Sequence, residues 1–200
     1  MKRTILSMAI ALLCSAWTAV ALADNNGENK GKKHRVLKFE VSELSPRFVF
    51  DETPLDADGK PGSGNEFVTE GVIYAAETLQ SGDDGVITER DANNKVISAK
   101  PKYPDRVIGR WTCRGWHVGE GAATKTGPWV ITHQFYDFDQ RPGEASFTTD
   151  GVELVDIDVA IKRAITGGTG PYKNMRGETV QTMIGFNSSD GVNLRFEIRP

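Results

Sequence analysis

Hydrophobic and polar residues alternate with a period of two over most of the chain. The clearest stretch lies near the C-terminus, where the apolar side chains would share one face of a strand: Val192, Leu194, Phe196 and Ile198. This period is typical of a β-strand with one buried face. Residues 155–161 alternate in the same way, so we expect a strand there and not a helix.

The periodicity predicts a succession of strands separated by segments rich in Gly, Pro, Asn and Asp. The predicted strands are 36–43, 47–50, 67–79, 86–90, 106–118, 129–138, 144–149, 152–165, 178–186 and 192–199. No convincing amphipathic helix is predicted in the mature chain. The pattern therefore predicts an all-β fold, either a sandwich or a closed antiparallel β-barrel of about eight strands, and closure removes the exposed edges that invite aggregation.

The N-terminal segment has the layout of a secretory signal peptide over residues 1–23: Lys2 and Arg3, an apolar run over 5–20, and a small-residue end at Ala23. We expect cleavage there and an exported protein, periplasmic or secreted. The apolar run is shorter than the roughly 20 residues that a membrane-spanning helix needs, so no membrane span is expected. Residues 24–35 are predicted to form a flexible polar leader, and 36–200 a single domain.

Loss of the signal peptide changes both the charge and the cysteine chemistry. Lys2 and Arg3 are removed with no acidic residue, so the formal net charge goes from -3 to -5, which argues against nucleic acid as a partner. Cys14 also leaves. Cys113 is then alone, so no intramolecular disulfide can form despite an oxidising destination.

Two central strands carry the candidate binding residues. In the strand predicted at 106–118, alternation places Trp111, Cys113 and His117 on the inward face. On the following strand the corresponding set is Trp129, Ile131, His133 and Phe135. An aromatic and largely apolar interior suits a small hydrophobic ligand. The same side chains would equally fill a small barrel by themselves.

Metal or thiol chemistry at these positions is the less favoured interpretation. His34, His117 and His133 match no compact zinc spacing, and a lone cysteine is most often a small buried hydrophobe. The acidic loop that starts at Asp56 fails as a calcium loop, because its twelfth position is Phe67 where a glutamate is needed. We therefore expect no metal and no cofactor.

A glycine-rich segment precedes the last two predicted strands: Ala164-Ile165-Thr166-Gly167-Gly168-Thr169-Gly170-Pro171-Tyr172, followed by Gly177. Glycine permits positive φ angles and close backbone approach, so a tight turn is expected. A phosphate-binding loop is the alternative, but such loops open a helix, whereas here a strand follows.

This segment resembles the allene oxide cyclase and dirigent families, in which an Ala-Ile-x-Gly-Gly-x-Gly motif leads into the last strands of a small antiparallel barrel. The resemblance implies a barrel with an apolar cavity and a homotrimer. It is specific only over the glycine motif.

A second, fainter resemblance covers Phe39-Glu40-Val41-Ser42-Glu43, which is similar to the Tyr-Glu-Ile-Asn-Glu segment of the cyclases. The glutamate of that family lies at the cavity floor and assists epoxide opening, and the resemblance gives this role to Glu40. Ser42 stands where the family has asparagine, which is a departure from its pattern. The alternation leaves the direction of Glu40 open, because its apolar neighbours could equally form the buried face.

The resemblance also places Cys113 and Tyr136 in the cavity. Together these observations predict an exported barrel that binds a small hydrophobic molecule and steers its cyclisation or stereoselective coupling, by orienting it and excluding water. As an enzyme it would be a cofactor-free cyclase or isomerase. The alternative is a non-catalytic periplasmic binding or interaction protein whose barrel is filled by its own side chains.

Overall fold

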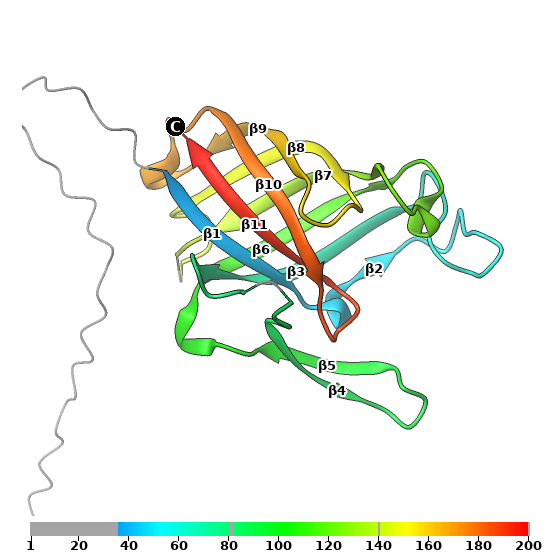
Figure 1. Cartoon of the computed structure of the whole chain (residues 1–200). Helices are drawn as coiled ribbons and strands as arrows, with labels where there is room; N and C mark the ends of the chain where they lie inside the picture. Colours follow the sequence, from blue (N-terminus) through cyan, green and yellow to red (C-terminus); the bar gives the residue numbers. More distant parts are fainter. Residues whose placement is uncertain (1–35, 81, 140, 200) are drawn as a thin grey trace, which may run out of the picture. The chain divides into compact units, whose positions relative to one another are not determined.

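The computed structural model describes residues 36–80, 82–139 and 141–199. The predicted signal peptide (1–23) and leader (24–35), with His34, lie outside the described residues. Figure 1 shows the β-strands wrapped into a barrel. The prediction of a closed antiparallel barrel is confirmed.

Eight strands close the barrel in the order β1-β11-β10-β9-β8-β7-β6-β3, and β3 pairs back to β1. Their bounds are β1 (Leu37–Glu43), β3 (Glu66–Ala75), β6 (Val107–His117), β7 (Pro128–Asp137), β8 (Ser146–Leu154), β9 (Ala160–Gly168), β10 (Gly177–Phe186) and β11 (Val192–Arg199). Every pairing among them is antiparallel. Most neighbours in the barrel are also neighbours in the sequence, which is the simplest way to close a sheet of hairpins.

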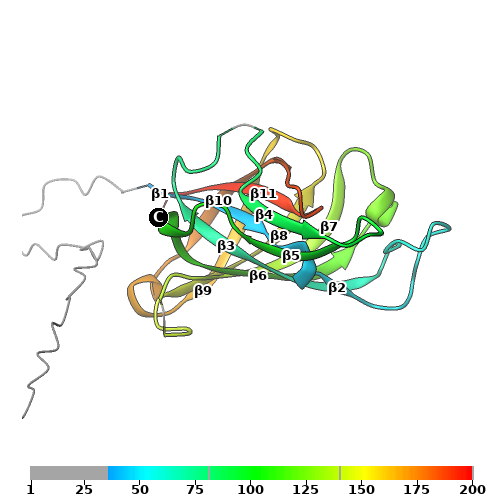
Figure 2. The same ribbon diagram turned by 90° about the horizontal axis from the view of Figure 1, so that it is seen from below.

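Two further elements lie outside the closed circuit. A short strand β2 (Val49–Phe50) follows β1 along the same side of β3 and pairs with the first residues of β3. The hairpin β4 (Val86–Arg90) and β5 (Val96–Pro101) forms a separate two-stranded sheet beside the barrel (Figure 2). Strand β5 was not predicted, because its sequence shows little alternation.

Strands 144–149 and 152–165 were predicted in the wrong places. The structure has β8 at Ser146–Leu154 and β9 at Ala160–Gly168, with a turn between them. Ile157 and Val159 are about half exposed in this turn, and Asp158 has a positive φ of 61°. Aspartate tolerates that backbone region better than most residues, so the chain reverses without a glycine or proline to signal it.

Aromatic rings fill the half of the barrel that is opposite to the C-terminal ends of β1 and β6. Phe39 stacks on Phe196 with 5.0 Å between ring centroids, and Tyr136 stacks on Phe147 at 4.5 Å. All four residues have no exposed surface. This packing closes one end of the barrel and supplies much of its apolar burial.

The glycine-rich segment forms the turn between β9 and β10 through the short 3-10 helix η4 (Gly170–Tyr172). Gly170 has a φ of 52°, and a Cβ there would collide with the carbonyl oxygen of Glu144. A Cβ on Gly168 would lie 2.5 Å from the carbonyl oxygen of Tyr172, whereas one on Gly167 would meet nothing within 4 Å. The segment is thus a close-packed turn against the β7–β8 loop, and not the start of a long helix.

The other helical turns are η1 (Ser45–Arg47), η2 (Pro104–Arg106) and η3 (Gly121–Ala123). In the described part of the chain, no helix has the length and apolar content to cross a membrane.

Candidate functional site

A cavity of about 570 Å³ lies at the end of the barrel where β1, β6, β8 and β10 finish and where β3, β7 and β11 begin. Its lining residues are Glu43, Ser45, Phe48, Phe50, Lys60, Pro61, Phe67, Thr69, Trp111, Cys113, His117, Ala122, Trp129, Val130, Glu153, Phe186, Asp190 and Val192. Four of these residues are exposed and mark the rim: Phe50, Lys60, Phe186 and Asp190. Ser45, Phe48, Ala122 and Trp129 are partly buried, and the rest of the lining is buried.

The walls are aromatic. Phe48 and Phe67 stack with their centroids 5.2 Å apart, and the ring of His117 lies 5.0 Å from that of Phe67. Trp111 and Trp129 also line the cavity. Burial lowers the pKa of His117 below its usual 6.5, which favours the neutral imidazole as part of this apolar wall.

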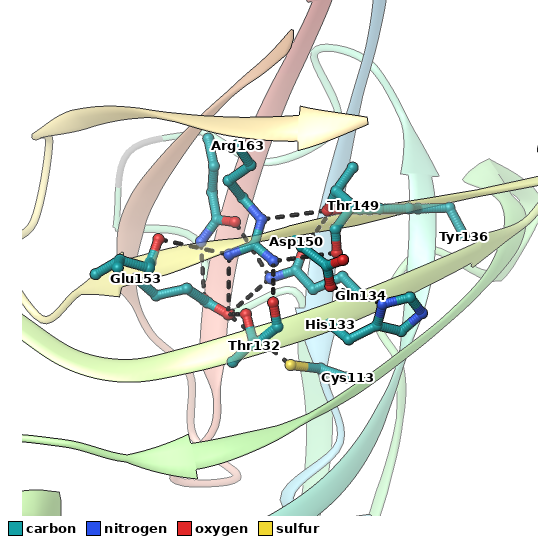
Figure 3. A network of polar contacts seen from close by, with 11 residues as sticks. Cys113, Thr132, His133, Gln134, Tyr136, Thr149, Asp150, Glu153 and Arg163 are labelled. Carbon is teal, nitrogen blue, oxygen red and sulfur yellow. Dashed lines mark hydrogen bonds and ion pairs between the residues drawn. The ribbon is translucent and has the colours of Figure 1, made fainter. Parts of the chain in front are cut away.

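A buried polar network forms the floor (Figure 3). Glu153 Oε1 accepts hydrogen bonds from Gln134 Nε2 at 2.8 Å and from Thr132 Oγ1 at 2.5 Å, and Glu153 Oε2 accepts one from Gln181 Nε2 at 2.8 Å. Tyr136 donates to Gln134 from the opposite side. The network therefore separates the cavity from the aromatic core beneath it.

Arg163 supports this floor from β9. Its side chain is fully buried, and Nη1 lies 3.6 Å from Glu153 Oε1. Nη2 donates to the carbonyl oxygen of Thr132 at 2.9 Å, and Nε donates to Thr149 Oγ1 at 3.2 Å. A buried charge persists only when it is paired and hydrogen-bonded, and Arg163 and Glu153 meet both conditions together.

Glu43 is the second buried carboxylate of the cavity, at the end of β1. Thr69 Oγ1 donates to its Oε1 at 2.6 Å, and the backbone N–H of Val192 donates to its Oε2 at 2.9 Å. Burial raises the pKa of Glu43, and the nearby charge of Glu153 acts in the same direction. The two hydrogen bonds oppose this rise without cancelling it.

Cys113 lies between these carboxylates and points at the floor, where its Sγ donates to Glu153 Oε1 at 3.8 Å. Burial and the charge of Glu153 raise the pKa of the Cys113 thiol well above its usual 9.0. A thiolate is needed for nucleophilic attack or metal binding, so the geometry favours an inert thiol. Among the described residues, no group of His, Cys, Asp and Glu side chains could hold a metal ion.

The structure brings Trp111, Cys113 and His117 together on the cavity wall, as the alternation of β6 predicts. On β7 the predicted phase applies only to Trp129. A β-bulge between Pro128 and Val130 makes Trp129 and Val130 both line the cavity and reverses the alternation after them.

Because of this bulge, Ile131, His133 and Phe135 lie on the outer face of the barrel, which corrects their predicted place in the cavity. His133 Nδ1 there lies 2.7 Å from Asp150 Oδ1. Tyr136 does point inward, but it belongs to the floor network and the aromatic core and does not line the cavity.

Glu40 and Ser42 lie on the outer face of β1, under the segment after β3. Phe39 and Val41 point into the barrel. Of the two possibilities that the sequence left open, the structure therefore has the one in which the apolar neighbours of Glu40 form the buried face. Glu40 is buried, and its Oε2 accepts hydrogen bonds from the backbone N–H groups of Thr78 and Leu79 at 2.9 and 2.8 Å. It therefore anchors that segment, and the cavity carboxylate of β1 is Glu43.

Sequence reasoning missed Glu43, Glu153 and Arg163. Glu43 shares the face of Phe39 and Val41, so the correct phase of β1 would have found it. Glu153 and Arg163 were missed because the two strands were predicted in the wrong places. The predicted break between residues 149 and 152 interrupts the alternation that places Glu153 inside the barrel.

Comparison with known proteins supports the architecture. No protein family and no curated protein matches this chain. Two solved pterocarpan synthase dirigent proteins match in structure: PsPTS1, with 14% identity and a TM-score of 0.56 over 84% of this chain and 95% of that chain, and GePTS1, with 11% identity and a TM-score of 0.53 over 90% and 96%. The chain has the dirigent-like barrel fold, as the glycine motif predicts.

Proposed function

We propose that this protein binds a small, largely apolar molecule in the cavity of its barrel and steers the cyclisation or stereoselective coupling of that molecule. The observation that carries the proposal is the cavity of about 570 Å³, with aromatic walls and a few buried polar groups. Small-molecule sites commonly have 300–1,000 Å³ and this mixture of apolar walls with a few polar groups.

The chemistry that suits this site is modest. A closed floor and aromatic walls hold a flexible molecule in one conformation and exclude water, which favours one of several competing products. Glu43 supplies a carboxyl group at the cavity wall, whereas the resemblance to the cyclases gives this role to Glu40 at the cavity floor. The dirigent proteins of the same fold include pterocarpan synthases, which supports a reaction of this broad kind.

Export and self-association belong to the same proposal. The signal-like sequence of residues 1–23 supports a periplasmic or secreted location. A row of exposed apolar residues crosses three strands on the outer face, where Trp116, Ile131 and Val152 are paired in register. Association into the expected homotrimer would give such a row a partner.

A non-catalytic binding or interaction protein is the second candidate. The observation in its favour is the other half of the barrel, which is filled by Phe39, Tyr136, Phe147 and Phe196. In that case the barrel would be a scaffold and the cavity a shallow end of it.

Native mass spectrometry of the protein purified gently from its own cells tests whether the cavity holds a small molecule. Ala122→Trp adds a large ring to the cavity lining, and Ala123→Trp is the matched control because Ala123 is equally half-buried but does not line the cavity. We expect a bound small molecule on the wild type and on Ala123→Trp, and its loss from Ala122→Trp. Empty protein in all three samples would favour the non-catalytic scaffold.

The recovered molecule then tests the steering. Its conversion in the presence of the wild type should give one stereoisomer in excess, and Ala122→Trp should leave the ratio found without protein. An unchanged ratio with the wild type would limit the function to binding.

A further inference from the structure

The two buried carboxylates of the cavity differ in how their charge is balanced. Glu153 has the guanidinium of Arg163 behind it. Glu43 is only 6% exposed, and its hydrogen-bond donors, Thr69 and the N–H of Val192, are both neutral. Within the part of the chain that the structure describes, no Lys, Arg or His forms an ion pair with Glu43.

A buried carboxylate without a cation is costly, and it lowers this cost either by taking up a proton or by meeting a positive charge. Burial raises the pKa of Glu43, which is a shift toward the first of these outcomes. A cationic ligand would supply the second.

The walls around this carboxylate favour the same kind of ligand. Positive charge is attracted to the faces of aromatic rings, most strongly to tryptophan, and the attraction grows when water is excluded. Phe48 and Phe67 form a stacked pair on one side, and Trp111 and Trp129 also line the cavity. Aromatic side chains of this kind are used to recognise organic cations, and Glu43 adds a carboxyl group that has no cation paired with it among the described residues.

We propose that the ligand is a flat, largely apolar organic cation, a protonated amine or a nitrogen-containing aromatic ring with a fixed positive charge, held against Glu43 by the aromatic walls. This inference rests on the proposed function, because it names the class of molecule that enters the same cavity. It assigns Glu43 as the residue that selects charge.

The titratable and charged groups around Glu43 come from several elements. They are Glu153 of β8, Cys113 and His117 of β6, and Lys60 and Asp190 at the rim. Burial favours the neutral forms of Cys113 and His117, and Arg163 pairs with Glu153. Of the buried groups in the lining, Glu43 is therefore the one that we expect to lose its proton as the pH rises above 4.5.

A matched pair of probes tests the proposal. 1-Methylquinolinium and 1-methylnaphthalene have nearly the same shape, and only the first carries a charge. Their dissociation constants are measured by equilibrium dialysis on the purified wild type, on Glu43→Gln and on Glu40→Gln, at pH 8. Glu40→Gln is the matched control, since it makes the same change on the same strand outside the cavity.

We expect the wild type and Glu40→Gln to bind the cation at least tenfold more tightly than the neutral probe. Glu43→Gln should weaken binding of the cation at least tenfold and change binding of the neutral probe less than twofold, which also shows that the variant is folded. In the wild type and in Glu40→Gln, but not in Glu43→Gln, the affinity for the cation should rise from pH 5 to pH 8 while that for the neutral probe stays constant.

Equal affinity of the wild type for the two probes, or a preference for the neutral one, would overturn the inference and leave the proposed function intact. An affinity for the cation that neither Glu43→Gln nor pH changes would also overturn it. Failure of both probes to bind the wild type would contradict the cavity function itself.

Discussion

The guanidinium of Arg163 lies 3.6 Å from the carboxylate of Glu153, with both side chains buried inside the barrel. The pair sits between the aromatic core and the cavity, and Gln134 and Gln181 complete the hydrogen bonds of the carboxylate. The floor of the cavity is thus a polar layer inside an otherwise apolar barrel. Its integrity decides whether the cavity keeps its shape.

Removal of Arg163 should be strongly destabilising. Arg163→Met leaves the Glu153 carboxylate buried without a counter-charge, so we expect a loss of about 3–5 kcal/mol in the free energy of unfolding. Arg163→Met combined with Glu153→Gln should cost less than the sum of the two single changes, because neither charge remains unpaired. Urea denaturation of the four proteins measures this coupling, and strict additivity would contradict a direct pair.

Glu40 should matter for stability and not for the ligand. Glu40→Ala leaves the N–H groups of Thr78 and Leu79 without their acceptor, which should cost about 1–3 kcal/mol. Ligand affinity should stay within twofold of the wild type. Glu178→Ala is the control, because its pair with Lys162 is exposed and should contribute little.

The pH dependence of stability should reveal Glu43. Its pKa is raised in the folded protein above the usual 4.5, so the protonated form is favoured by folding. The stability that this proton contributes is complete below pH 4.5 and is lost as the pH rises through the raised pKa.

We therefore expect the wild type to lose stability relative to Glu43→Gln between pH 4.5 and pH 8, since glutamine cannot ionise. Denaturant titrations of both proteins at several pH values provide the measurement. A difference between the two that is independent of pH would show that Glu43 is ionised throughout this range.

The glycine turn offers a test with its own control. Gly170→Ala forces an alanine into a φ of 52° and against the carbonyl of Glu144, whereas Gly167→Ala meets open space. We expect Gly170→Ala to reduce the free energy of unfolding by at least about 1–3 kcal/mol and Gly167→Ala by less than about 0.5 kcal/mol. Equal effects on thermal unfolding would mean that the turn is not close-packed in solution.

The sequence predicted the fold better than the site. Alternation is reliable where one face is buried along a whole strand, as in β11, and it placed Val192, Leu194, Phe196 and Ile198 inside. It failed at β7, because the bulge at Trp129 shifts the phase by one residue and nothing in the local composition signals a bulge. On β1 the same one-residue uncertainty in the phase of the alternation determines whether Glu40 or Glu43 is expected to face the cavity.

The floor network was harder still. Arg163 and Glu153 look like solvent-facing residues in the sequence, because charged side chains are rarely buried unless they are paired. Only the closed sheet brings β8 and β9 around the same interior and makes the pair visible. Long-range pairing of this kind is not encoded in any local pattern.

The tryptophans test most directly whether the cavity takes up a small, largely apolar molecule. Trp111 and Trp129 line the cavity, while Trp116 is 46% exposed on the outer face. In a nitrogen–proton NMR spectrum, titration with 1-methylnaphthalene or 1-methylquinolinium should shift the indole signals of Trp111 and Trp129 in a saturable way and leave that of Trp116 unchanged. If neither probe moves the two cavity signals, or if Trp116 alone responds, the cavity does not bind such molecules.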